Sequence, residues 1–298
     1  MAEEIRETFI EKSETMKGLD PWTKNNVRLN AQNVGVFSFF APQFSTKGAV
    51  EEFANQVNSA VPWKNKSLDY FLGISKFVAA GWMEPMRTLL PGERNTRRRY
   101  SVFDTSCHFS AQKNAVLIPE GLFNRSIPTS TKERMFHVPR VGPRLAACLF
   151  QAVFEENFYH PYERLWTIAS NEAFKQIPSC LSKQYGIKRK SWMLGEIEAN
   201  AGLAVAYQVF QDRLFTKRYL QKDYRLQGCD RLSSNQLFFV YFAMSYCEHS
   251  THKKSDSMRN FFENRVNVPV MNSKEFADAF SCQPGSPMNP TTKCTVLM

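Results

Sequence analysis

Histidines are the side chains best suited to bind a transition metal or to transfer protons at neutral pH, and this sequence has five. A helix that holds zinc through two imidazoles needs them four residues apart, so that both reach the metal from one face. No two histidines here have that spacing. His249 and His252 are three residues apart and follow Glu248, but they lie in a predicted loop beside Lys253 and Lys254, whose charges oppose a bound cation. We therefore predict no metal site there.

Cysteine offers a second kind of chemistry, and the chain has seven cysteines, none of them in a C-x-x-C pair. That spacing argues against an iron–sulfur cluster or a zinc ribbon. Cys282 and Cys294 flank a proline-rich tail over residues 284–290 that helices alone would not order. Such tails are usually held by disulfides formed in an oxidising compartment. An odd number of cysteines leaves at least one thiol unpaired or bonded to a partner chain.

Composition excludes several classes of protein. The formal charge is +10, but apart from a run of arginines at residues 94–99, beside a Pro-Gly turn, the basic residues are spread along the chain. We predict that this run is a solvated loop and that the protein does not bind nucleic acid. The most apolar stretch, residues 70–83, is too short to span a bilayer. Residues 1–7 are acidic and do not resemble a signal peptide, so that these features taken alone predict a cytosolic chain.

Hydrophobic periodicity predicts mainly helices, packed on a core rich in phenylalanine. Asp20 and Pro21 are a favourable N-cap and first-turn pair for one of them. Residues 114–119 are the best predicted strand, because they are rich in aliphatic side chains and stop at a proline. We therefore predict an α+β protein, mainly α with a small β element. The predicted helices span residues 3–34 with a break near 18–21, 46–59, 66–90, 142–154, 163–176, 196–221, 233–247 and 273–280.

Several stretches carry a family resemblance. Residues 233–243 read S-S-N-Q-L-F-F-V-Y-F-A and are similar to a helix L-T-x-x-Q-L-F-F-x-x-F-A of the neprilysin and endothelin-converting enzyme family of zinc metallopeptidases. Residues 272–294 match the closing signature of that family, and the strand ending Pro119-Glu120-Gly121 resembles its F-P-A-G-I segment. The resemblance covers essentially this whole chain but less than half of a family member.

The resemblance implies a thermolysin-like catalytic domain. Residues 1–100 then form a helical segment that precedes the catalytic strand, and residues 101–298 form the catalytic domain. Active relatives hold zinc with an H-E-x-x-H motif that is followed by G-F-D-D. Aligning Phe154-Glu155-Glu156 with the F-D-D end places the motif on residues 148–152, which contain no histidine and no glutamate. We interpret Cys148 as a small buried apolar residue rather than a thiolate ligand. The first, second and last motif positions are Cys148, Leu149 and Ala152.

The third ligand of the family is the glutamate of G-E-N-I-A-D-N-G-G, whose aspartate orients an imidazole. Opening a one-residue gap matches Glu196 to that ligand. In the other register Gly195 falls there and Ala199 replaces the aspartate. An alternative interpretation is that Glu196 and Glu198 solvate or cap the start of a helix.

Substrate-binding positions of the family have also changed. Its N-A-x-Y, which hydrogen-bonds the substrate backbone, is matched by residues 106–109, which read S-C-H-F. Its H-S-P-x-x-F-R-V-N supplies a transition-state histidine and a substrate-binding arginine. Arg265 matches that arginine, whereas Arg259 stands at the histidine position. Arg265 is able to bind a carboxylate; a purely structural ion pair is the alternative.

The resemblance further implies a disulfide between Cys180 and Cys294. It also implies that Cys247 and Cys282 bridge to an N-terminal region without a counterpart here, so that these two pair with each other, stay reduced or bond a partner. The cysteines that match none of the family are Cys107, Cys148 and Cys229.

These changes predict a catalytically inactive family member that binds peptides or another protein and needs no zinc. One alternative is a divergent zinc metalloendopeptidase with residual hydrolysis through an unrecognised site. Another is a fragment of a longer family member with no role of its own. The family resemblance implies an extracellular or plasma-membrane ectodomain, although no signal peptide or membrane span is recognised in the sequence.

Overall fold

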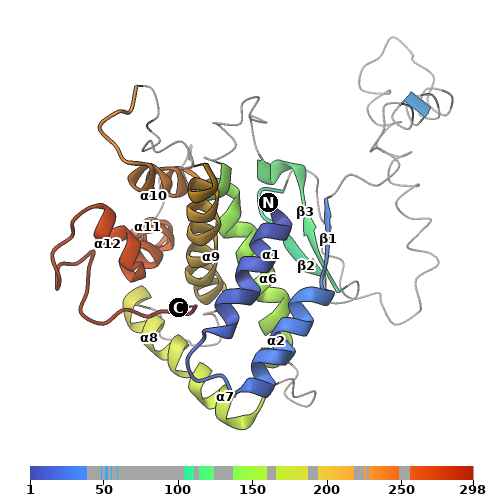
Figure 1. Ribbon diagram of the computed structural model, residues 1–298, viewed down its shortest axis with the longest axis horizontal. Coiled ribbons are helices and arrows are strands. Elements are labelled where there is room, and N and C mark those ends of the chain that lie inside the picture. The colour runs from blue at the N-terminus through green and yellow to red at the C-terminus, as the bar shows by residue number, and fades with distance from the viewer. Residues whose placement is uncertain are drawn as a thin grey trace.

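The computed structural model describes residues 1–38, 104–110, 114–123, 137–159, 166–186, 194–217, 225, 228–247 and 256–297, with isolated positions between 48 and 59. Within these ranges the chain is mainly helical with one small sheet, as predicted (Figure 1). The arginine run at 94–99 and the helix predicted at 66–90 lie outside the described residues, as does most of the helix predicted at 46–59.

Two helices open the chain, α1 (Ala2–Glu14) and α2 (Pro21–Asn33), with the predicted break between them. The Asp20 side chain accepts a hydrogen bond of 3.0 Å from the backbone N–H of Thr23, so it is the N-cap that the sequence indicated. The turn is tight because Gly18 has φ +84° and packs against Ala173. A Cβ added to Gly18 would stand only 2.6 Å from the Cβ of Ala173. This turn brings α2 onto the later helix α7 (Ile168–Phe174).

The N-termini of α2 and α7 cap each other. The Asp20 carboxylate accepts hydrogen bonds from the hydroxyls of Thr167 and Ser170, at the start of α7. In return the Ser170 hydroxyl accepts from the backbone N–H of Asp20 at 3.0 Å, and the Thr23 hydroxyl accepts from that of Thr167 at 3.2 Å. Segments about half the chain apart are thereby fixed together.

The sheet has three strands in the order β1-β3-β2, formed by β1 (Gly35–Ser38), β2 (His108–Ser110) and β3 (Ala115–Ile118). The predicted strand at 114–119 is β3, and the 3-10 turn η3 (Glu120–Phe123) follows its closing proline. β1 pairs parallel with β3, and β2 pairs antiparallel with it. Because β1 precedes residue 100 and β3 follows it, the two predicted parts of the chain share one sheet and one core.

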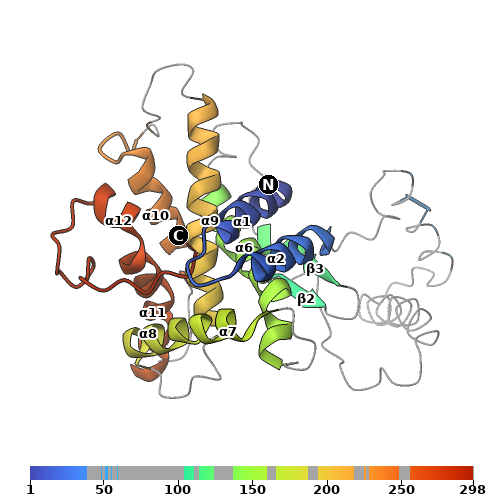
Figure 2. The same cartoon turned by 60° about the horizontal axis from the view of Figure 1, so that its bottom comes forward.

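The centre of the molecule is the pair α6 (His137–Tyr159) and α9 (Leu194–Lys217). They approach closely because Gly202 faces the carbonyl oxygen of Pro143, only 2.2 Å from where a Cβ would stand. The sheet lies on one side of this pair and the C-terminal helices lie on the other, while α7 and α8 (Gln176–Tyr185) cross its lower end (Figures 1 and 2). The predicted helix at 142–154 is therefore the middle of a longer helix.

Aromatic side chains fill the core, as the phenylalanine content indicated. Phe150 and Phe154 of α6 stack with ring centroids 4.0 Å apart. Trp166 meets Phe154 edge-on at 4.9 Å, and Phe174 of α7 lies 5.3 Å from the same ring. Phe9 of α1 closes the cluster from the N-terminal side, at 6.4 Å from Phe154.

The C-terminal helices are α10 (Ser234–Met244), α11 (Asp256–Asn272) and α12 (Lys274–Ala279). In place of the helix predicted at 163–176, the structure has α7, which ends at Phe174, and the next helix, α8, begins at Gln176. Helices α8 and α11 were not predicted from the sequence, because each contains a proline that opposes a helix assignment. Pro178 is tolerated because it lies in the first turn of α8, whereas Pro269 lies inside α11 and is accommodated by packing.

Candidate functional site

The position that would carry the first zinc-binding imidazole is part of a disulfide. Cys148, in the middle of α6, is bonded to Cys107, the residue before β2, with 6.3 Å between their Cα atoms. Cys148 is only 7% exposed. Its interpretation as a lone small apolar residue was wrong, although it is buried as expected. While this bond exists, the sulfur is not available as a thiolate ligand.

The rest of the motif offers no replacement donor. Ala152, four residues after Cys148 on the same face of α6, is buried and has a methyl group where the second imidazole would be. Leu149, at the position of the glutamate base, is buried and lines a small apolar cavity of about 10 Å³. Among the described residues, no three His, Cys, Asp or Glu side chains gather where they could hold a metal ion. The side chains at the motif positions therefore do not fit a zinc ion.

Arg144 adds a polar connection one turn before the disulfide. Its guanidinium donates to the carbonyl oxygen of Thr105 at 2.8 Å and to that of Ser245, after α10, at 2.7 Å. The same group lies over the ring of Tyr246, 5.2 Å from its centroid. Both hydrogen-bond partners are carbonyl oxygens, which leave the positive charge of Arg144 in place. Arg144 was not predicted from the sequence, where its only signal is the spacing of four residues from Cys148.

Glu196 is the carboxylate that remains from the family's ligand set. It lies in the first turn of α9 and is 5% exposed. Burial raises its pKa, while its own backbone N–H and the nearby charge of Arg265 act in the opposite direction. The alternative of a solvated helix start does not fit this degree of burial.

The register of this segment needs correction at Ala199. Residues 195–203 and the family's nine-residue pattern align without a gap, which places Glu196 rather than Gly195 opposite the ligand and Asn200 opposite the aspartate. Asn200 is one helical turn after Glu196, and its amide donates to the carbonyl oxygen of Glu196 at 2.8 Å. It is buried, whereas Ala199 is partly exposed. A neutral amide therefore stands where the supporting carboxylate would be.

Arg265 of α11 acts electrostatically on the start of α9. Its charge acts on Glu196 and also lowers the pKa of Tyr185 and Tyr246, both of which burial raises. Arg144 of α6 lies over the ring of Tyr246, and the charge of Arg265 of α11 acts on the same phenol. The region is thus a buried carboxylate and two phenols beside two cations.

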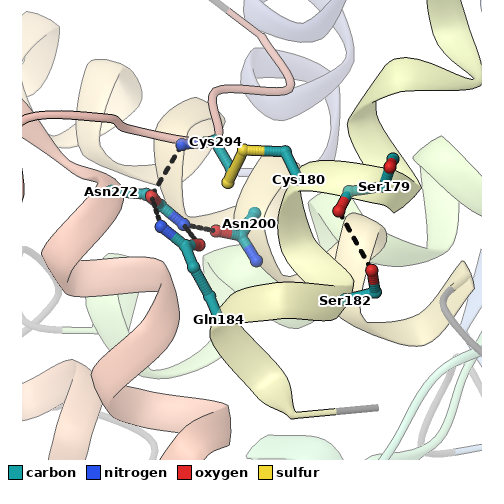
Figure 3. Close-up of a disulfide and its surroundings, with 7 residues drawn as sticks. All are labelled: Ser179, Cys180, Ser182, Gln184, Asn200, Asn272 and Cys294. Carbon is teal, nitrogen blue, oxygen red and sulfur yellow. Dashed lines mark hydrogen bonds between the residues drawn. A yellow bond between two sulfur atoms is a disulfide. The ribbon is translucent and has the colours of Figure 1, made fainter. Parts of the chain in front are cut away.

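A second disulfide, which the family resemblance implied, connects α8 to the C-terminal tail. Cys180 of α8 is bonded to Cys294, as the resemblance implied, which ties the C-terminal tail to the middle of the domain. Beside it the amide of Asn272 exchanges hydrogen bonds with the amide of Gln184, at 2.8 and 3.0 Å, and donates to Asn200 at 3.0 Å (Figure 3). The Asn272 oxygen also accepts from the backbone N–H of Cys294 at 2.8 Å. This network holds the N-terminal part of α9, whose first turn contains Glu196.

Other predicted positions contribute less. The backbone of Arg259 lies in α11, but its side chain is outside the described residues, as are His249 and His252. In the described structure Cys247 and Cys282 do not pair with each other, and both are free, as is Cys229. Along the helices that are described, none is long and apolar enough to cross a membrane.

Comparison with known proteins gives matches of three kinds. Residues 162–296 match the model of Peptidase family M13. Endothelin-converting enzyme 1 of Bos taurus is 25% identical over 315 aligned positions, which cover 98% of this chain and 40% of that protein. Neprilysin-3 of Drosophila melanogaster is 30% identical over 212 positions, which cover 64% of this chain and 26% of that protein. The chain therefore spans about two fifths of the length of the endothelin-converting enzymes that it matches.

The solved structure of a Mycobacterium tuberculosis zinc metalloprotease in complex with an inhibitor superposes with a TM-score of 0.69 at 12% identity. The superposition covers 100% of this chain and 46% of that chain. At this level of identity the likeness concerns the fold, and it agrees with the predicted thermolysin-like domain.

Proposed function

Because this chain is related to the neprilysin and endothelin-converting enzyme peptidases, and its C-terminal part matches peptidase family M13, we propose that it is a catalytically inactive member that acts by binding. Its ligand is a peptide or an acidic segment of another protein. The observation that carries the proposal is the use of Cys148 in a disulfide, with Ala152 one turn later on the same helix. A helix with these two side chains supplies no imidazole to a metal, and Leu149 is not able to act as a general base.

Electrostatics favours an anionic group as the part of the ligand that is recognised. Arg265 and Arg144 both act on Tyr246, and the contacts of Arg144 leave its charge in place. A guanidinium binds a carboxylate through two parallel hydrogen bonds, which makes such contacts strong and directional. The C-terminal carboxylate of a peptide, or a glutamate or aspartate side chain, has this chemistry.

The first experiment separates the inactive protein from a divergent endopeptidase, which the retained and buried Glu196 favours as the second candidate. The purified chain is analysed for zinc by mass spectrometry and incubated with a peptide that carries bulky hydrophobic residues. We expect less than stoichiometric zinc and no cleavage that a chelator removes. One zinc per chain together with chelator-sensitive cleavage would refute inactivity.

A second experiment tests binding. Isothermal titration with a peptide library is expected to give micromolar affinity that added zinc does not change. Arg265→Ala should weaken binding of a peptide with a free carboxylate by about 10- to 100-fold, because charge-assisted hydrogen bonds are worth about 1.5–3 kcal/mol. Arg28→Ala is the matched control, since Arg28 lies on the exposed side of α2, where it binds Asn25. Equal affinity of the Arg265 variant and the control would exclude Arg265 from the binding site.

The third candidate, a fragment of a longer family member without a role of its own, gives a different result. Such a chain would fold cooperatively and bind no peptide in the same titrations. We favour the binding protein because two cations remain beside Tyr246 after the motif residues have been replaced.

Two disulfides support a location in an oxidising compartment, such as the extracellular space that the family resemblance implies. There the exposed thiol of Cys247 is also available for a disulfide with a partner chain. Non-reducing electrophoresis of the protein from its native source tests this pairing, because a bonded partner would appear as a larger species that a reductant separates.

A further inference from the structure

The segment that leads into β2 is fastened to one face of α6, which is the face on which the two imidazoles of a zincin helix stand. Two links hold it there. One is the Cys107–Cys148 bond, and the other is the hydrogen bond of 2.8 Å from Arg144 to the carbonyl oxygen of Thr105. Arg144 and Cys148 are four residues apart and therefore share a face, and Ala152 is one further turn along it.

The covalent link is part of the packed core. Cys107 is 5% exposed and belongs to the same hydrophobic cluster as Cys148. The described part of the chain between them includes β2, β3, the turn η3 and the first half of α6, so the bond closes a loop that contains the β2–β3 hairpin. The bond therefore determines how the hairpin is seated on α6.

We propose that the Cys107–Cys148 disulfide stands in for a metal as the crosslink of this site, so that the folded chain depends on oxidation and not on zinc. A metal held by side chains of different elements contributes its binding energy to folding. Here a sulfur–sulfur bond occupies the first of the motif positions and joins α6 to the segment before β2. The disulfide stabilises the folded state because it closes a loop in the unfolded chain and so lowers the entropy of that chain. The two cysteines are 41 residues apart in the sequence.

The chemistry balances as a thiol–disulfide exchange with a small-molecule disulfide such as oxidised glutathione. The thiolate of one cysteine attacks the glutathione disulfide, which releases one glutathione thiolate and leaves a mixed disulfide. The thiolate of the second cysteine then attacks the protein sulfur of that mixed disulfide and releases the second glutathione thiolate. The protein loses two electrons and two protons, and the oxidant becomes two thiols.

The test refolds the full chain in a glutathione buffer and maps its disulfides by digestion without reduction. We expect a linked pair of peptides that contain Cys107 and Cys148. Urea unfolding is then followed with and without a chelator, for the parent and for the double variant Cys107→Ala/Cys148→Ala. Cys229→Ala is the control, because it removes a cysteine that forms no bond in the described structure.

The chelator should leave the unfolding midpoint unchanged. Loss of the crosslink should raise the unfolding equilibrium constant on the order of several hundred-fold, from the loop-closure relation. The control should stay within about twofold, as expected for a substitution outside special features.

A Cys148 that alkylates without reduction, a double variant as stable as the control, or a chelator that lowers the midpoint would each overturn the proposal. If the double variant fails to fold, the peptide map of the parent and its unfolding with and without a chelator still test the proposal. Peptide affinity is measured separately, so the binding proposal stands or falls on its own result.

Discussion

Asn272 lies at the end of α11, and its side chain connects three parts of the chain that are distant in sequence. Asn272 is 7% exposed, and its amide takes part in four hydrogen bonds, with Gln184 of α8, Asn200 of α9 and the backbone of Cys294. Asn272→Ala would leave the N–H of Cys294 and the amide oxygen of Asn200 without these partners in buried surroundings. The amide of Gln184 is only partly buried, so water is able to replace what it loses.

The magnitude follows from the two buried groups. A buried donor or acceptor left without a partner costs about 1–3 kcal/mol, so two of them cost about 2–6 kcal/mol. The free energy of unfolding, measured in urea by circular dichroism, should fall by that amount with an unchanged denaturant slope. Asn267→Ala is the matched control, because Asn267 is exposed on the same helix. We expect that control to change stability by less than about 0.5 kcal/mol.

A loss below about 1 kcal/mol for Asn272→Ala, with the slope unchanged, would contradict the reasoning, because unsatisfied buried groups cost more than that. It would mean that water or a rearranged Asn200 amide satisfies the network. Crosslinking by Cys180–Cys294 is independent of this substitution, so its persistence in a peptide map separates loss of the hydrogen bonds from loss of the disulfide.

Two other predictions concern the positions that hold α2 and α9. The hydroxyls of Ser170 and Thr167 hold the pKa of Asp20 well below its usual range, so its stabilisation is present above the unfolded pKa of about 3.9 and is lost as pH falls toward the folded value. Asp20→Asn should therefore flatten the acid limb of a plot of unfolding free energy against pH, and an unchanged limb would contradict this. Gly202→Ala would place a Cβ 2.2 Å from the carbonyl oxygen of Pro143. It should lower the unfolding free energy by about 1–3 kcal/mol in urea titrations, as overpacking does, and a neutral effect would show that α6 and α9 separate without cost.

Local signals in the sequence were sufficient where the structure is local. Asp20 and Pro21 define a helix start within four residues, and β3 ends at Ile118, just before the proline that the sequence predicts as its limit. The strand β1 was not predicted because it has only four residues and depends on pairing with β3, about 80 residues away. The helix α11 was missed because Pro269 opposes a helix locally and only tertiary packing overrides it.

The candidate site divides in the same way. Glu196 and the Cys180–Cys294 bond could be placed through family resemblance, because their surroundings in the sequence retain the pattern. The Cys107–Cys148 bond could not be placed, since neither cysteine matches the family and connectivity depends on which segments meet in space. Arg144 and Tyr246 belong to elements that the sequence did not bring together, and their contact appears only in the folded chain.

The mutual capping of α2 and α7 has a consequence for the order of events during synthesis. The hydrogen bond between Asp20 and Thr167 joins residues 147 positions apart. At about 5–20 residues per second, a ribosome needs roughly 7–30 s to make the intervening chain. During that interval the helix that begins after Asp20 lacks its partner cap, and Phe9 lacks the rings of α6 on which it packs. The first two helices therefore leave the ribosome with an apolar face that a chaperone or neighbouring chains have time to reach.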